Sequence, residues 1–385
     1  MGATEDERPC PDLIYLDYQA TTPLDPRVRE AMEPWLGAPA NPHATEHRAG
    51  RAAAAAVEQA RKRVASLLEC RSDEITFTSG ATEASNIALA GLLGRGDRLV
   101  ISAIEHSSVA ATADALALDG VEVVRVDVDA DGIIDLEKLE AALDGAVLAS
   151  VMQVNNEIGT IQPIADVAAL SVGAGVPLHC DMTQGAGKTV SPLGGGQIGY
   201  ASLSSHKIYG PQGVGALYVR RGARKPHALT HGGGQERSLR PGTVPVAACV
   251  GFGKACEIAA AEAIADAAHA SALQRTMLAV LSGLQGWHVN GSMEQRVPHN
   301  LNVTIAGVQS DALIAALPDL ALASGSACNG GATGSSPTLA ALGLSGDAAA
   351  CTIRLGFGRG TTEAEIIQAG KRIVAASAAI RGASR

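Results

Sequence analysis

The sequence contains few aromatic residues: Phe, Trp and Tyr make up 3% of its 385 residues. Alanine and glycine must therefore fill much of the interior, so we expect close contacts between helices and sheet. No segment is long and apolar enough to span a bilayer, and the acidic N-terminus lacks the basic and then apolar order of a signal peptide. Acidic residues outnumber basic ones, 39 to 30, and the net charge of −9 argues against direct binding to nucleic acid.

Paired cysteines are also missing. The chain has seven cysteines, an odd number, and none forms a Cys-x-x-Cys pair. This pattern argues against a disulfide framework and against a structural zinc site. It predicts a protein of the reducing cytoplasm that holds no metal. Cysteines within stretches rich in Ala, Val and Leu are predicted to be small core residues: Cys70, Cys249, Cys256 and Cys351.

The apolar pattern predicts an α/β fold. Strand-like runs alternate with helical runs over most of the first 220 residues, which is typical of a mostly parallel sheet with helices on both faces. After a long helix near 250–285, a smaller α+β region follows, and the length favours two domains. The expected strands are 75–78, 98–102, 121–127, 146–153, 177–181, 199–204 and 214–219. The expected helices before residue 220 are 46–69, 82–93, 106–118, 135–143 and 163–173.

Polar residues follow several of these strands, at the point where each strand ends. Ligands of parallel sheets bind in the loops beyond the carboxyl ends of the strands. The shared position of several polar residues at strand ends is stronger evidence for a binding site than any single residue would be. The residues at such junctions are Thr82, His106, Asn156, Asp181 and Lys207.

Lys207 and Asp181 together indicate a cofactor. A lysine between a strand and a loop, among small and apolar neighbours, can bind an aldehyde cofactor covalently. A carboxylate from a neighbouring strand can pair with the protonated ring nitrogen of that cofactor. The cofactor with this chemistry is pyridoxal 5′-phosphate.

A phosphate site is expected where the strand 75–78 ends. The residues from Ser79 through Ala81 and Thr82 open a helix, whose backbone N–H groups and dipole favour a phosphate. The simpler alternative is that Thr82 only caps this helix. Ser204 and His206 are further candidate donors to the phosphate, and the alternative for the serine is ordinary loop sequence.

Four more residues are candidates for contacts with a cofactor or substrate. The His106 imidazole is suited to stacking on the cofactor ring and to proton transfer, or else to a structural hydrogen bond. Asn156 is a candidate for the cofactor hydroxyl or a substrate carboxylate, unless it only forms a turn. Gln184 is placed to reach the same ring oxygen. Arg354, isolated between apolar residues, suits a substrate carboxylate or a structural salt bridge.

Two glycine-rich segments are predicted to be functional loops. Residues 230–245 contain His231, four glycines, Arg237 and Arg240, and a loop of this length in a compact protein is usually functional. Residues 324–331 place one thiol, Cys328, among glycines and polar residues.

These residues together resemble the cysteine desulfurases, which are NifS- and IscS-like enzymes of the class V aminotransferase group. The resemblance runs from about Tyr15 to the region 354–365, and its motifs occur in family order. They are Tyr15–Pro23, Thr78–Glu83, Glu105-His106, Asn155–Gly159, His206–Pro211 and Ser324–Cys328. The implied fold is type I of the pyridoxal-phosphate enzymes. Its large domain would be 16–257, and its small domain would comprise 1–15 and 258–385.

The resemblance also implies a role for each candidate. Lys207 would bind the cofactor covalently, Asp181 its ring nitrogen and Gln184 its hydroxyl, with His106 stacked on the ring. Thr82, Ser204 and His206 would hold the phosphate, with Thr243 reaching in from the second subunit of a homodimer. Asn156 and Arg354 would hold the carboxylate of L-cysteine. Cys328 would accept the sulfur as a persulfide, leaving L-alanine, and pass it to an acceptor protein.

Three questions stay open at this point. A selenocysteine lyase or another class V aminotransferase shares the fold, although transamination needs no thiol. A non-catalytic scaffold for sulfur transfer is a second alternative. The sulfur could serve Fe–S assembly, RNA thiolation or, as in one branch of the family, DNA phosphorothioation. The residues after Cys328, Asn329 to Pro337, lack the Leu-Glu-Pro-Ser stretch of the housekeeping members and so do not identify the acceptor.

Overall fold

The computed structural model describes residues 12–324, 336–344 and 346–383. Within these ranges the central sheet has seven strands in the order β2-β8-β7-β6-β5-β3-β4. β8 runs antiparallel to both of its neighbours and the other pairs are parallel, so the predicted mostly parallel sheet is confirmed. The strands are β2 (Ile75–Thr78), β3 (Arg98–Ser102), β4 (Glu122–Val126), β5 (Leu148–Ser150), β6 (Leu178–Asp181), β7 (Tyr200–Ser204) and β8 (Gly215–Val219).

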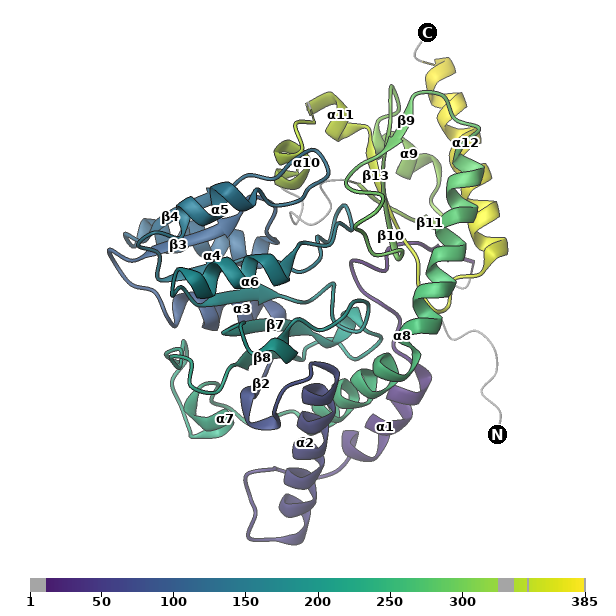
Figure 1. The fold of residues 1–385 in the computed structure, drawn as a ribbon. Coiled ribbons are helices and arrows are strands. Elements are labelled where there is room, and N and C mark those ends of the chain that lie inside the picture. Colours follow the sequence, from purple (N-terminus) through teal and green to yellow (C-terminus); the bar gives the residue numbers. More distant parts are fainter. Residues whose placement is uncertain (1–11, 325–335, 345, 384–385) are drawn as a thin grey trace, which may run out of the picture.

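Helices cover both faces of this sheet (Figure 1). One core contains residues of α2 (Arg48–Leu67), α5 (Leu136–Ala142), α6 (Ile164–Gly173) and the first half of α8 (Val246–Leu281). The other contains residues of α3 (Ala81–Ala90) and α4 (Ser107–Leu118). Leu148 belongs to the second core and Ala149 to the first, as the alternation of side chains along a buried strand requires.

Small residues bring the helices close together, as the scarcity of aromatic residues predicts. In the contact between α2 and α8, a Cβ atom placed on Gly253 would lie 2.6 Å from Cα of Ala60. A larger side chain at position 253 would therefore push the two helices apart. In the described part of the chain, no helix is both long enough and apolar enough to cross a membrane.

The C-terminal part builds a second layer beside the large sheet, and α8 connects the two. In Figure 1, α8 leaves the large sheet and runs beside α12 (Glu363–Ala383). The first half of α8 packs in the core of the large sheet up to Ile258, and from Leu273 onward it packs in the second core. The predicted domain boundaries remain a prediction. The other elements here are β9 (Trp287–Val289), β10 (Asn300–Ile305), α9 (Ser310–Ala316), β12 (Ala323–Ser324) and β13 (Thr352–Gly356), with β1 (Ile14–Tyr15) paired to β11 (Leu320–Ala321), and the short helices α10 (Pro337–Ala341) and α11 (Gly346–Ala350).

Before residue 245, two of the α-helices in the described ranges were not predicted. α1 (Pro26–Leu36) begins after Asp25, whose carboxylate accepts a hydrogen bond from the Arg27 backbone N–H. The second, α7 (Gln235–Ser238), lies within the segment 230–245 that was predicted to be a loop throughout.

The backbone of α7 is unusual, because Glu236, Arg237 and Ser238 all have φ between 45° and 62°. Left-handed conformation costs about 1–2 kcal/mol for each residue that is not glycine. The buried Glu236 carboxylate offsets this cost, because it binds both terminal nitrogens of Arg61 at 2.7 and 2.8 Å and the Phe77 N–H at 2.7 Å. An ion pair to α2 thus fixes the shape of the arginine-rich segment.

Candidate functional site

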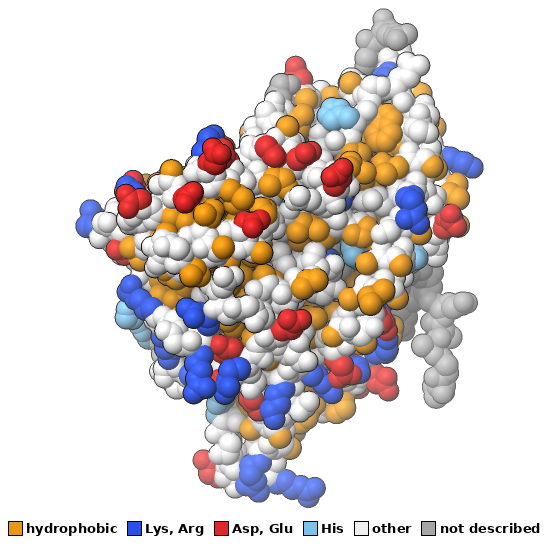
Figure 2. Space-filling model, in the orientation of Figure 1, with side chains coloured by type: hydrophobic (Ala, Val, Ile, Leu, Met, Phe, Trp, Pro, Cys, Tyr) orange, Lys and Arg blue, Asp and Glu red, His pale blue; other side chains and the backbone are white. Residues whose placement is uncertain are grey.

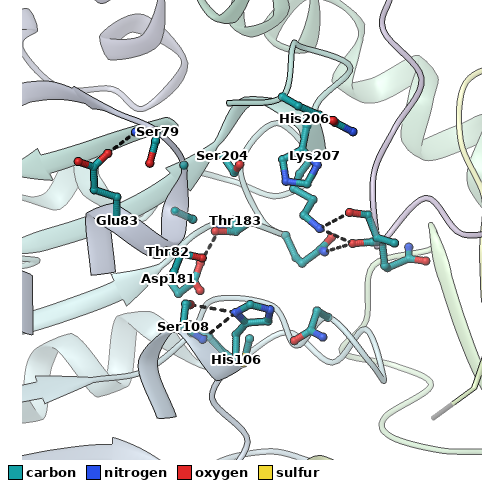
Figure 3. Close-up of a pocket in the computed structure, with 18 of the residues that line it drawn as sticks. Ser79, Thr82, Glu83, His106, Ser108, Asp181, Thr183, Ser204, His206 and Lys207 are labelled. Atoms are coloured by element: carbon teal, nitrogen blue, oxygen red, sulfur yellow. Dashed lines mark hydrogen bonds between the residues drawn. The ribbon is translucent and has the colours of Figure 1, made fainter. Parts of the chain in front are cut away.

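A cavity of about 520 Å³ opens where β5, β6 and β7 end. Its wall contains Met152 and Val154 after β5, Asp181 at the end of β6 and Ser204 at the end of β7. The candidate residues that line it are Ala81, Thr82, His106, Asn156, Asp181, Gln184, Ser204, His206 and Lys207. The expected convergence of strand-end residues is therefore present, and Figure 3 shows it from inside the cavity.

Lys207 extends into this cavity from the short turn after β7. Its Nζ atom donates hydrogen bonds to the backbone carbonyls of Gln19, at 2.6 Å, and of Ala20, at 2.7 Å. These carbonyls belong to the N-terminal segment, more than 180 positions away in the sequence. Figure 3 shows Lys207 above and His106 below, with Asp181 to the left of both. The Lys207 amine is thus held against the N-terminal segment at the wall of the cavity.

Two carboxyl groups, Asp181 and Glu105, are buried under the cavity. Asp181 Oδ1 accepts the Thr183 N–H at 2.9 Å, and Glu105 Oε1 accepts the Met152 N–H at 2.7 Å. Burial, and then the charge of Asp181, raises the pKa of Glu105 well above its usual range. This shift favours the protonated form of Glu105. The Asp181 carboxylate, which lines the cavity, is the candidate partner of a protonated ring nitrogen.

His106 caps α4 as well as lining the cavity. Its Nδ1 accepts the backbone N–H of Ser108 at 3.1 Å and lies 2.9 Å from the Ser108 hydroxyl. Burial lowers the pKa of His106, against the opposing charge of Asp181. Because a backbone N–H can only donate, the neutral ring keeps its proton on Nε2. His106 is thus a flat, uncharged donor, which suits stacking on a ring better than removing a proton.

The start of α3 provides the candidate phosphate end of the cavity. Gly80, not Thr82, occupies the N-cap position, and no side chain caps the helix. The alternative that Thr82 is merely a cap is therefore wrong, and the helix start retains N–H groups for a ligand. Gly215 lets β8 pass closely behind it, since a Cβ there would lie 2.6 Å from Cα of Gly80.

His206 also lines the cavity. Its Nδ1 is 3.0 Å from the Thr21 hydroxyl. Burial, and then the positive charges of Lys207 and Lys188, lowers the pKa of His206 to about 4, so the ring is neutral.

The donor set fits pyridoxal 5′-phosphate. The wall of the cavity contains an uncapped helix start, a buried carboxylate, a flat neutral imidazole and a lysine amine. The buried Thr183 hydroxyl on the wall has no hydrogen-bond partner among the described residues, so it is a donor that a ligand could use. In the described ranges, no group of three or more His, Cys, Asp or Glu residues is arranged to hold a metal ion.

Arg354 stands behind the cavity wall. Its Nη1 donates to the carbonyl of Asn156 at 3.2 Å, and its Nη2 forms an ion pair with Asp17 at 2.8 Å. The structural salt bridge considered as an alternative is therefore present. Any substrate carboxylate that Arg354 binds must share the guanidinium with Asp17. The role of Arg354 as a substrate-binding residue remains a prediction.

Cys328 lies outside the described residues, but both flanks of its segment are placed. Ser324 pairs with Ile353 in the strand that carries Arg354. On the other side, the Ser336 hydroxyl donates to the Glu157 carboxylate at 2.5 Å. The described residues on either side of 325–335, Ser324 and Ser336, thus contact the neighbours in sequence of Arg354 and Asn156.

Some functional residues fall outside the cavity or were missed in the sequence. Thr243, a candidate for the phosphate, is exposed and does not line the cavity. Sequence reasoning missed Gln19 and Thr183, which line the cavity, and Lys188, which contacts Gln184. The only sequence signal for Thr183 and Lys188 is their position shortly after Asp181, in the segment that also carries Gln184.

Comparison with known proteins agrees with a site for pyridoxal 5′-phosphate. Residues 14–368 match the family model described as aminotransferase class-V. The chain is 45% identical to cysteine desulfurase IscS of Vibrio cholerae over 362 residues, which cover 92% of this chain and 90% of that protein. A solved NifS-like protein superposes with a TM-score of 0.88 at 34% identity, covering 94% of this chain and 98% of that one. The solved structure of DndA from Streptomyces lividans superposes with a TM-score of 0.75 at 36% identity, covering 90% of this chain and 100% of that one.

Proposed function

This chain belongs to the cysteine desulfurases of the class-V aminotransferase family, and from that premise we propose how its residues share the reaction. The enzyme uses pyridoxal 5′-phosphate to remove sulfur from L-cysteine. The observation that carries the assignment of residues is the meeting of Lys207, Asp181 and His106 around one cavity. The bound cofactor supplies an electron-poor ring that stabilises negative charge at Cα of the substrate.

The protein positions the substrate and moves its protons. Asp181 pairs with the ring nitrogen and keeps it protonated, and the neutral His106 ring lies against the cofactor. Lys207 Nζ takes the proton from Cα of cysteine, since its amine lines the cavity in which the substrate would bind. Asn156 and Arg354 orient the substrate carboxylate.

Sulfur leaves the substrate by attack from a protein thiol. The Cys328 thiolate bonds to the substrate sulfur, the carbon–sulfur bond breaks, and the carbon skeleton leaves as L-alanine after protonation. Cys328 then carries a persulfide. A free thiol has a pKa near 8.5, so only a few per cent is thiolate at neutral pH unless its surroundings favour the anion. Arg237 and Arg240, in the segment 230–245, are candidates for that positive field.

The acceptor of this sulfur is a protein. The net charge of −9 gives nucleic acid no general electrostatic reason to approach. Figure 2 shows acidic side chains over the upper part of one face, and basic ones near α2 and α7, so this face is mixed in charge. Relatives include IscS enzymes and the desulfurase DndA, so Fe–S assembly, RNA thiolation and DNA phosphorothioation are all candidate pathways of this cytoplasmic enzyme.

Product analysis tests the proposed activity. The purified protein with cofactor and a thiol reductant should convert L-cysteine to L-alanine and sulfide in equal amounts, without any added keto acid. An aminotransferase would instead need a keto acid and would yield no alanine from cysteine alone. Pyruvate and ammonia as the main products would rule the proposal out. The same assay with L-selenocysteine in place of L-cysteine tests the selenocysteine lyase alternative, because the two rates of alanine formation can be compared.

We also propose a homodimer with shared sites. Thr243 is exposed on its own subunit, and the segment that carries it is held in shape by the Arg61–Glu236 pair. Arg240 Nε donates to Glu83 at 3.1 Å, so this segment lies next to the phosphate end of the cavity. A second subunit packed there would receive Thr243 at its own phosphate.

Mixed dimers test this arrangement. Lys207→Ala and Thr243→Ala homodimers should both be impaired, the second about tenfold at limiting cofactor because one hydrogen bond to the phosphate is lost. The mixed dimer should regain one full site, about half of the wild-type rate, because its intact Lys207 faces the intact Thr243 of the other subunit. If Thr243 acts within its own subunit, the mixed dimer has no intact site. Differentially tagged subunits allow the measurement, and a fully active monomer in sedimentation would contradict the dimer itself.

A further inference from the structure

Lys188 is a second lysine beside the cavity, and no step described above uses it. It lies seven residues after Asp181, in the turns that follow β6, and its side chain is half-buried. Its Nζ donates a hydrogen bond to Oε1 of Gln184 at 3.1 Å. Gln184 itself lines the cavity.

The hydrogen bonds of Gln184 fix which way its amide points. Nε2 of Gln184 donates to the backbone carbonyl of Gln19 at 3.0 Å. A carbonyl can only accept, so the NH₂ group must face Gln19, and the amide oxygen must face Lys188. An amide nitrogen has two N–H groups, and Gln19 takes one of them. The second N–H of Gln184 is available to a ligand, because the Gln184 side chain lines the cavity.

We propose that Lys188 is a positioning residue, which holds the Gln184 amide with its N–H toward the ring oxygen of the cofactor and so favours that oxygen as an anion. This inference rests on the proposed function, because it concerns the cofactor of that site. Without Lys188, the amide oxygen loses its donor, and only the bond to the Gln19 carbonyl still opposes a turn that would present the amide oxygen to the ring oxygen. Two acceptors would then face each other.

The surroundings of Lys188 explain why a lysine suits this task. Burial, and then the charge of Lys207, lowers the pKa of Lys188 to about 7. His206 and His299 also lie within its electrostatic reach, and burial keeps both rings neutral. An anionic ring oxygen nearby would favour the ammonium form of Lys188, and the ammonium in turn strengthens its hold on the amide oxygen.

The visible absorption of the bound cofactor reports this effect, because its pH-dependent change follows the proton shared between the Lys207 nitrogen and the ring oxygen. In the holoenzyme of Lys188→Met, the midpoint of this change should rise by about one pH unit, a tenfold change in the equilibrium, since the anion loses one donor. Gln184→Ala should shift it similarly. Lys188→Arg, which keeps a charged donor, should stay close to wild type.

The double variant decides between positioning and a direct effect of charge. If Lys188 acts through Gln184, then Lys188→Met combined with Gln184→Ala shifts the midpoint no further than Gln184→Ala alone. Additive shifts, or a Lys188→Met midpoint within about 0.2 unit of wild type, would overturn the inference. Lys188→Ala, measured in parallel, guards against a packing effect of methionine. A wild-type protein without the visible band would instead contradict the assigned role of Lys207.

Discussion

Lys207→Ala should lose the visible absorption band of the bound cofactor and at least about 10³-fold in the rate of alanine formation, because one substitution removes both the covalent attachment and the base. The holoenzyme spectrum and a product assay at saturating cofactor give the two results. The phosphate end of the cavity is untouched by the change. The variant should therefore still bind the cofactor, but with the absorption of a free aldehyde.

The fold should survive this substitution. Lys207 donates to two backbone carbonyls, and that of Gln19 keeps a second donor in Gln184, so the change in the free energy of unfolding should be about 1 kcal/mol. Lys138→Ala is the matched control, because Lys138 is an exposed lysine of α5. It should keep both the band and the activity. A Lys207→Ala protein with the wild-type band would show that another amine holds the cofactor.

The elements that the sequence predicts well are those defined by local pattern. The strands β2 and β3 lie where predicted, since short apolar runs bounded by turn residues are enough to define a buried strand. The strand at 146–153 is shorter than predicted, Leu148–Ser150, although the chain remains buried through Asn156. Burial continues there because the chain passes along the cavity. Apolar character alone therefore overestimates the strand.

The features that the sequence does not predict depend on distant partners. The left-handed residues of α7 are stabilised by Arg61, 175 positions before Glu236. The Gln184 amide is oriented by the carbonyl of Gln19, 165 positions earlier, and Lys207 is held by the same atom. No periodicity or propensity reports such contacts. Residue type alone could therefore suggest Lys207 and Asp181, but not the network that orients them.

Cys328→Ser should abolish sulfide release while leaving the earlier events intact, since a serine hydroxyl is a poor nucleophile toward sulfur at neutral pH. We expect the rate of sulfide release to fall at least about 10³-fold, which is the usual effect of removing a catalytic group. The cofactor band, and the spectral change that L-cysteine causes, should both remain. This separation is expected because Lys207 and Asp181 act before the thiol and belong to other elements.

Cys70→Ser provides the matched control for a thiol without a role. Burial, and then the charge of Glu74, raises the pKa of Cys70 to about 12, so this side chain stays a thiol at neutral pH. Its replacement should leave sulfide release unchanged. Sulfide release by Cys328→Ser at the wild-type rate would show that the enzyme transfers sulfur without this cysteine.

Transfer of labelled sulfur completes the test. Wild-type enzyme given L-cysteine labelled in its sulfur should carry the label on Cys328, in a bond that thiol reductants cleave, and should pass it to a protein that offers a thiol. Cys328→Ser should carry no such label. The acidic balance of the chain predicts that purified DNA or RNA, incubated with the enzyme alone, stays unlabelled. Direct labelling of either nucleic acid would contradict the protein acceptor, because the enzyme would then deliver sulfur without an intermediate carrier.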